Sequence, residues 1–197
     1  MNPIKKDAEI LNVWNERAGL GEIAGTNDFM LTRIEQDFLE SIVPPKTRIL
    51  DIGCGNSSTL IRLAKKSGCT GIGIDFSEKM IKTSKKSVKE AELDAVIENY
   101  HASVPPVPKD YGMFDVVISN RCLINLSSLE DQEKSVKSVA GVLNPGGMFL
   151  MIECFQDGGD LTNSMRKKLG LEPINAPWHN LFFNKKDVLG WQSEEFS

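Results

Sequence analysis

Residues 49–57, Ile-Leu-Asp-Ile-Gly-Cys-Gly-Asn-Ser, decide the fold of this chain. An apolar run ends around Asp51, and Gly53 and Gly55 then interrupt it before a helical pattern begins. This order predicts a strand, a glycine-rich turn and a helix, because glycine allows a positive φ and lets the backbone approach a ligand closely. A second apolar run ends in Asp75. An acid at that strand tip lies where a nucleoside presents its ribose hydroxyls, so we expect a nucleoside cofactor.

Composition limits the classes of protein that fit. The 197 residues are 41% hydrophobic and carry a net charge of −4, which predicts one structural unit with a full core. The acidic balance argues against a protein that grips nucleic acid through its phosphates. The first residues lack the apolar segment of a secretory signal, and the longest apolar stretches are too short to cross a bilayer. We therefore expect a cytoplasmic protein with no nucleic-acid or membrane partner.

The four cysteines do not form a metal-binding pattern. They stand at positions 54, 69, 122 and 154, without a Cys-x-x-Cys pair or a histidine at metal-ligand spacing. This distribution favours reduced, mostly buried thiols, and no metal site is predicted. Cys54 lies inside the glycine turn, but nothing in the sequence marks it as a nucleophile.

Strand and helix patterns alternate along most of the chain. Strands are predicted at 47–52, 70–75, 95–100, 113–119 and 148–154, and helices at 57–66, 77–91 and 128–142. The residues Asn144-Pro-Gly-Gly147 predict a tight turn before the fifth strand. The alternation predicts an α/β fold, a doubly wound Rossmann-like parallel sheet with right-handed crossovers.

Two further helices are predicted before the first strand. One covers 4–17, and the other is expected to be capped by Thr26 or Asn27 and to end before Pro44. We divide the chain into an N-terminal helical lid or brace, residues 1–46, and a Rossmann-like domain, residues 47–197.

The glycine turn differs from two common nucleotide motifs. A dinucleotide site needs a third glycine where this chain has Ser58, and a phosphate-binding loop needs a Gly-Lys-Ser/Thr sequence that is absent. Four other motifs stand in order: Leu50-Asp-Ile-Gly-Cys-Gly55, Gly73-Ile-Asp75, Phe114-Asp-Val-Val-Ile-Ser119 and Leu143-Asn-Pro-Gly-Gly147. Through these motifs the chain resembles the class I S-adenosylmethionine-dependent methyltransferases of the bacterial small-molecule type, over about residues 12–183.

The resemblance implies a pocket for S-adenosylmethionine, with S-adenosylhomocysteine as the product. It places Gly53, Cys54 and Gly55 around the methionine and ribose, Asp51 near the ammonium group, and Asp75 on both ribose hydroxyls, where an ionised acceptor binds strongly. Further implied contacts are Phe76 and Met80 beside the adenine, His101 and Ala102 near its amino group, and Ser119, Asn120 and Arg121 toward the methionine end and the acceptor. After the third strand, many relatives have an acid at the position where this chain has His101 or its neighbour. The chain departs from the family at this point.

Two N-terminal stretches also resemble the family. Trp14-Asn-Glu-Arg-Ala18 and Ala24-Gly-Thr-Asn-Asp28 are similar to the lid of a subset of bacterial small-molecule methyltransferases. In that interpretation Arg17 pairs with the methionine carboxylate, and Gly25, Thr26 and Asp28 close over the methionine end. The alternative is a helix–turn–helix brace with ordinary capping.

Methyl transfer from a sulfonium is an in-line displacement that depends mainly on alignment. A general base is needed only when the acceptor is a hydroxyl or a protonated amine. His179 is the candidate catalytic residue, either as that base or as a group that orients the acceptor. The alternative is a structural histidine that anchors its loop. Arg121 and Asn125 are candidates for orienting a polar or anionic acceptor, or for capping local backbone.

The carboxyl-terminal part departs from the family sheet, which adds an antiparallel hairpin after its fifth strand. Here residues 160–170 and 184–196 are predicted as helices, so the apolar stretch 148–155 would remain an edge. We expect either a truncated gene product or a partner chain over that edge, for example in a homo-oligomer, and truncation is favoured.

The sequence therefore predicts an S-adenosylmethionine-dependent methyltransferase that acts on a small molecule, such as a sugar or a glycan precursor. Two alternatives stay open. One is a non-catalytic or truncated cofactor-binding protein. The other is an NAD-dependent oxidoreductase, which the missing third glycine disfavours.

Overall fold

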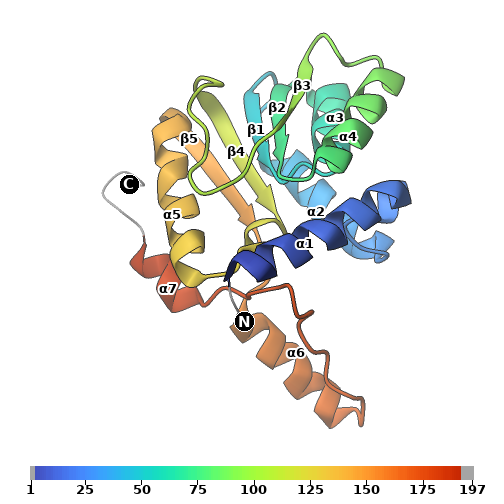
Figure 1. Ribbon diagram of the computed structural model, residues 1–197, viewed down its shortest axis with the longest axis vertical. Coiled ribbons are helices and arrows are strands. Elements are labelled where there is room, and N and C mark those ends of the chain that lie inside the picture. The colour runs from blue at the N-terminus through green and yellow to red at the C-terminus, as the bar shows by residue number, and fades with distance from the viewer. Residues whose placement is uncertain (1–2, 192–197) are drawn as a thin grey trace.

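The computed structural model describes residues 3–191 and shows a parallel sheet with helices on both faces (Figure 1). The five strands lie in the order β3-β2-β1-β4-β5, and every neighbouring pair is parallel. Their bounds are β1 Arg48–Ile52, β2 Thr70–Asp75, β3 Ile97–His101, β4 Phe114–Asn120 and β5 Leu143–Ile152. The prediction of a doubly wound Rossmann-like sheet is confirmed.

The helices follow the predicted order. They are α1 Pro3–Arg17, α2 Phe29–Ile42, α3 Ser58–Ser67, α4 Glu78–Glu90, α5 Leu129–Val139, α6 Gln156–Lys168 and α7 Lys185–Gly190, with short 3-10 segments at Ala18–Ile23, Leu123–Asn125 and Ala140–Val142. The helix predicted at 184–196 ends earlier, and its residues 192–196 lie outside the described residues.

Alternate residues of each strand fill two separate hydrophobic layers, as the period of a strand requires. In β1, Leu50 and Ile52 pack in the layer that includes α5, whereas Ile49 packs in the layer that includes α2 and α3. All three are fully or almost fully buried. Burial on both faces explains why β1 and β4 have near-continuous apolar sequences.

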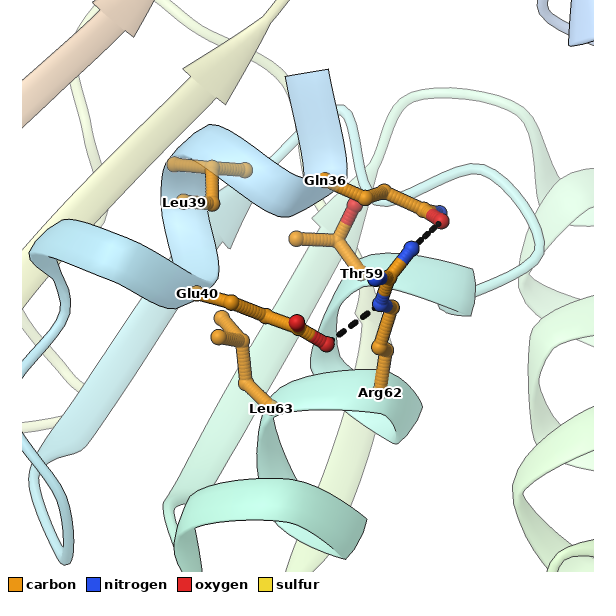
Figure 2. Close-up of a pocket in the computed structure, with 6 residues that line it drawn as sticks. All are labelled: Gln36, Leu39, Glu40, Thr59, Arg62 and Leu63. Atoms are coloured by element: carbon orange, nitrogen blue, oxygen red, sulfur yellow. Dashed lines mark hydrogen bonds and ion pairs between the residues drawn. The ribbon is translucent and has the colours of Figure 1, made fainter. Parts of the chain in front are cut away.

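A cluster of charged side chains fastens α2 to α3 (Figure 2). Arg62 of α3 donates to Gln36 at 2.9 Å and also pairs with Glu40, which pairs in turn with Lys66. The side chains fill the space between the helices, which holds no water-sized volume. The hydrogen bonds from Arg62 and Lys66 lower the pKa of Glu40 to about 2.

The cap of α2 differs from the prediction. Neither Thr26 nor Asn27 caps this helix. Asp28 does, because its Oδ1 accepts from Leu31 N at 2.9 Å. Thr26 Oγ1 instead accepts from Asp28 N at 3.1 Å. An acid as N-cap also suits the positive end of the helix dipole. The sequence alone did not single out Asp28, because two other capping residues directly precede it.

The fifth strand begins earlier than predicted. Its pairing with β4 jumps from Phe114–Leu143 to Val116–Met148, so the predicted tight turn at 144–147 lies inside β5 as a bulge, with Gly146 at a φ of 78°. A bulge places extra residues opposite one partner residue without ending the pairing.

β5 lies at the edge of the sheet. Within residues 3–191 no strand pairs along its outer side, and beyond its end a single parallel bridge joins Phe155 to Phe183. The stretch Met148–Ile152 is apolar and half-buried. The described part of the chain contains no helix that is both long and apolar enough to cross a membrane.

Candidate functional site

The glycine turn after β1 is held against the tip of β2. The N–H groups of Gly53 and Cys54 both donate to Ile74 O, at 2.8 and 3.0 Å. Gly53 has a φ of 73°, and a Cβ at this position would lie 2.3 Å from Cys122 Sγ. Only glycine therefore lets the turn pass this close to the segment after β4.

Two carboxylates lie directly beneath this turn. Asp75 accepts from Gly55 N at 3.1 Å and from Ser77 N at 2.8 Å. Asp51 is only 3% exposed, and burial together with the nearby Asp75 raises its pKa to about 7. The turn thus combines backbone donors with two acids, an arrangement that can bind the amine and hydroxyl groups of a ligand.

Cys54 points into the protein interior. Its Sγ lies 3.6 Å from Asn99 Oδ1, and burial raises the pKa of the thiol well above its usual range. A thiol in such surroundings stays protonated and unreactive. Any contact of Cys54 with a ligand is therefore through its main chain.

The four residues predicted for the adenine side gather at the tips of β2 and β3. Asp75 and His101 are register partners, His101 Nε2 lies 2.9 Å from Phe76 O, and Ala102 N donates to Asp75 O at 3.0 Å. Met80 lies in the first turn of α4 and is 2% exposed. The expected hydrophobic neighbours of a base are thus close together.

The N-terminal segment lies across the carboxyl ends of the strands (Figure 1). Asn56 of the glycine turn donates to Gly21 O at 3.2 Å, and Ser77 Oγ donates to Asn15 Oδ1 at 2.7 Å. Trp14 packs in a small apolar cluster with Met80. The segment therefore contacts the glycine turn and the start of α4, while α2 contacts α3.

Three of the predicted lid residues, Arg17, Thr26 and Asp28, make local contacts. Arg17 donates to the carbonyl oxygens of Ile23 and Ala24, and its guanidinium lies 5.7 Å from the centre of the Trp14 ring. Gly25 is exposed, and a Cβ there would meet only Arg121 Nη2, at 3.9 Å. Asp28, capping α2, is likewise exposed.

Arg121 and Asn120, at the tip of β4, face an acid that the sequence reasoning missed. Glu35 of α2 is 7% exposed and receives Arg121 Nη2 at 3.1 Å and Asn120 Nδ2 at 3.4 Å. Burial raises the pKa of Glu35, although the Arg121 charge opposes this. No single signal in the sequence of α2 distinguishes Glu35 from the other acids of this helix, because the face that packs on α3 also contains Glu40.

A second missed acid, Glu153, follows the last residue of β5. It accepts from Ser119 Oγ at 2.5 Å, and burial raises its pKa to about 7. Its place after an apolar strand is equivalent to those of Asp51 and Asp75, and this position was the available signal.

His179 belongs to the loop between α6 and α7, which returns to α1. Its ring centre lies 6.2 Å from that of Trp14 and 5.4 Å from that of Trp178. The loop is anchored by Leu181 N, which donates to Ile124 O at 2.6 Å. Burial, followed by the charges of Arg17 and Lys6, lowers the pKa of His179, so the ring is neutral near pH 7.

Several buried polar atoms of these same elements have no hydrogen-bond partner among the described residues. They are Trp14 Nε1, Asn120 Oδ1, Arg121 Nε, His179 Nδ1 and Asn180 Oδ1. Buried polar atoms are rarely left unpaired, so these atoms have hydrogen-bonding capacity for water or a ligand. No group of three or more His, Cys, Asp or Glu residues suited to a metal ion occurs within the described residues.

Comparison with known proteins gives the class to which this site belongs. Residues 49–147, half of the chain, match a family described as a methyltransferase domain. The chain therefore belongs to the class I S-adenosylmethionine-dependent methyltransferases, the family that the four motifs indicated.

Individual relatives agree with this assignment. The chain is 32% identical to a demethylmenaquinone methyltransferase from Staphylococcus saprophyticus, over 77% of this chain and 63% of that protein. It is 30% identical to a 27-O-demethylrifamycin SV methyltransferase from Amycolatopsis mediterranei, over 71% and 52%. A crystal structure of a methyltransferase from Geobacter sulfurreducens with S-adenosylhomocysteine shares the fold, with a TM-score of 0.57, 20% identity, and coverage of 80% and 60%. The match spans only about half to three-fifths of the two curated relatives' lengths.

Proposed function

We propose that this protein transfers the methyl group of S-adenosylmethionine to a small-molecule acceptor in the cytoplasm. One observation carries the proposal. The glycine turn, Asp51, Asp75 and the tip of β4 lie together at the carboxyl ends of the strands, beneath the amino-terminal segment. The two curated relatives, named for the methylation of a quinone precursor and of a rifamycin, support a small acceptor.

The residues present fit this cofactor. A Cβ at Gly55 would meet nothing within 4 Å, so the turn has open space on one side, and Gly53 allows the close backbone approach. Asp75 has acceptor capacity left for ribose hydroxyls beside its two main-chain bonds. Asp51, Gly53, Cys54 and Gly55 would hold the methionine end together with the residues of the β4 tip and of the lid, which are Ser119, Asn120, Arg121, Arg17, Gly25 and Thr26. Phe76, Met80, His101 and Ala102 would border the adenine. When bound, the cofactor supplies a methyl group on a sulfonium, a good leaving group.

For the acceptor we propose a sugar or a glycan precursor. Trp14 and Trp178 flank His179, and aromatic faces pack well against the apolar faces of sugar rings. The unpaired polar atoms of Asn180 and Arg121 suit hydroxyl and anionic groups. Aromatic side chains beside a few placed polar groups are typical of small-molecule sites.

His179 is the candidate base for a hydroxyl acceptor. Its lowered pKa keeps it neutral and able to take a proton at neutral pH. The alternative role as an anchor of its loop predicts a loss of stability, not of turnover alone, when it is replaced.

Calorimetric titration with S-adenosylhomocysteine tests the proposal. We expect binding, and Asp75→Ala should weaken it by about 1.5–3 kcal/mol, the worth of charge-assisted hydrogen bonds. Asp94→Ala, a change of an exposed acid, is the matched control and should bind as the wild type does. Folded wild-type protein that binds NADH but not S-adenosylhomocysteine would support the oxidoreductase instead. Binding without turnover across a panel of sugars would leave a cofactor-binding protein.

A further inference from the structure

The carboxylate of Glu153 faces four donors at the end of β4. Ser119 Oγ, Cys122 N and Leu123 N donate to Oε1 at 2.5, 3.1 and 2.9 Å, and Ile124 N donates to Oε2 at 3.3 Å. Three of these donors are consecutive main-chain N–H groups, which form a concave site for an anion. One side chain thus accepts hydrogen bonds from three consecutive amides of the turn that follows β4.

This turn includes a residue in an unfavourable backbone conformation. Arg121 has a φ of 52°, in the left-handed region that non-glycine residues seldom adopt, and its N–H donates to Ile152 O at 2.8 Å. Strain of this kind persists only where the surroundings enforce it. Glu153, on the residue after Ile152, holds both sides of Arg121 through Ser119 and Cys122.

The conformation of Arg121 decides where its guanidinium lies. That group reaches Glu35 at 3.1 Å and approaches the lid at Gly25, while its Nε is buried and unpaired among the described residues. If the turn relaxed to an ordinary φ, the guanidinium would leave this place. The position of Arg121 therefore depends on the carboxylate of Glu153.

We propose that Glu153 is a positioning residue of the methyl-transfer site, which, as a carboxylate, holds the turn after β4 so that Arg121 presents its guanidinium to the ligand. This inference rests on the proposed function. Glu153 does not contact the reacting atoms in this proposal and acts through Arg121.

The four hydrogen bonds that Glu153 accepts form a clamp on the turn after β4, and this clamp should depend on pH. All four groups around Glu153 are donors, which suits an ionised carboxylate and opposes a protonated one. Burial brings the pKa of Glu153 to about 7, although the hydrogen bonds lower it. The other titratable groups that face it are the Cys122 and Cys154 thiols, whose own pKa values are raised, and Arg121 carries the nearby positive charge. The clamp should therefore be complete above neutral pH and weaken below it.

Hydrogen exchange of the ligand-free protein tests the clamp itself. In Glu153→Gln, the protection factors of the Cys122, Leu123 and Ile124 amides should fall ~10-fold, the worth of one hydrogen bond to a charged group. The Asn125 and Leu126 amides donate to main-chain carbonyls of the same turn and should keep their protection. In the wild type the three amides should lose protection as the pH falls through about 7, and Glu153→Gln should abolish this dependence.

Titration with S-adenosylhomocysteine then tests positioning. Glu153→Gln should weaken binding ~10-fold, again the worth of one charged hydrogen bond. The double variant Glu153→Gln/Arg121→Met should bind no more weakly than Arg121→Met alone, because Glu153 acts through Arg121. Glu133→Gln, a change of an acid on α5 that pairs with Lys137, is the matched control. Glu153→Asp keeps the charge with a shorter reach, and it should give an intermediate effect if Glu153→Gln does not fold.

The outcomes separate the two proposals. Unchanged protection in Glu153→Gln, or additive losses in the double variant, would overturn the positioning role while leaving the proposed function intact. Wild-type protein that shows the pH-dependent clamp but does not bind S-adenosylhomocysteine would overturn the proposed function, and with it the role of Glu153 in methyl transfer.

Discussion

Replacing Gly53 by alanine should be among the most damaging small changes in this protein. The residue has a φ of 73°, and the new Cβ would lie 2.3 Å from Cys122 Sγ and 2.5 Å from Cys122 Cβ. The left-handed conformation costs a residue with a Cβ about 1–2 kcal/mol. Forcing an extra carbon into a packed site costs about 1–3 kcal/mol more. We therefore expect the free energy of unfolding to fall by about 2–5 kcal/mol, a large share of the ~5–15 kcal/mol of an ordinary domain.

The matched control lies two residues along the chain. Gly55 also has a positive φ, of 53°, but its Cβ would meet nothing within 4 Å, so Gly55→Ala should cost only the ~1–2 kcal/mol of strain. Urea unfolding measures both changes. Adding Cys122→Gly to Gly53→Ala should restore the part of the unfolding free energy that is lost through the packing clash, but not the part that is lost through backbone strain. Equal losses in the two alanine variants, or no recovery in the double variant, would refute this account of the turn.

Three further predictions concern other parts of the molecule. The pKa of Glu40 is about 2 in the folded protein, against its ordinary value of 4.5, so its ion pairs should stabilise the protein above about pH 4.5 and be lost toward pH 2. In acid titrations of stability, Glu40→Gln should remove about 1 kcal/mol of that decline, the usual scale for partly exposed pairs; an unchanged titration would contradict this. His179→Gln should lower kcat about 100-fold while binding S-adenosylhomocysteine normally, if the histidine is a base; equal kcat would exclude that role. Copies of the chain should associate through the open edge of β5, seen as a molar mass that rises with concentration in light scattering; a constant monomer mass would exclude it.

The parts of the fold that local chemistry specifies could be predicted from the sequence. The glycine turn, the acids at the tips of β1 and β2 and the order of the elements follow from short runs of residues. Cys122 was recognised only as a buried thiol, because its contact with Gly53 joins segments distant in the chain.

The features that could not be predicted from the sequence depend on tertiary contacts. Glu35 and Glu153 are ordinary acids in the sequence, and their importance appears only when folding buries them against Arg121 and the turn after β4. The bulge in β5 escaped prediction for a related reason. Its residues have the sequence of a free turn, and only the pairing of Leu143 and Met148 with β4 on either side of them shows that the strand continues.

The placement of α1 across the strand tips has a kinetic consequence. Under the proposed function, we expect a nucleoside-sized molecule to reach the turn beneath this helix when the amino-terminal segment moves aside, and to leave by the same route. Few polar bonds, such as those of Asn15 and Asn56, resist that swing. Arrival should therefore be slower than diffusional encounter, and the residence time of the spent product should follow the opening rate of the segment.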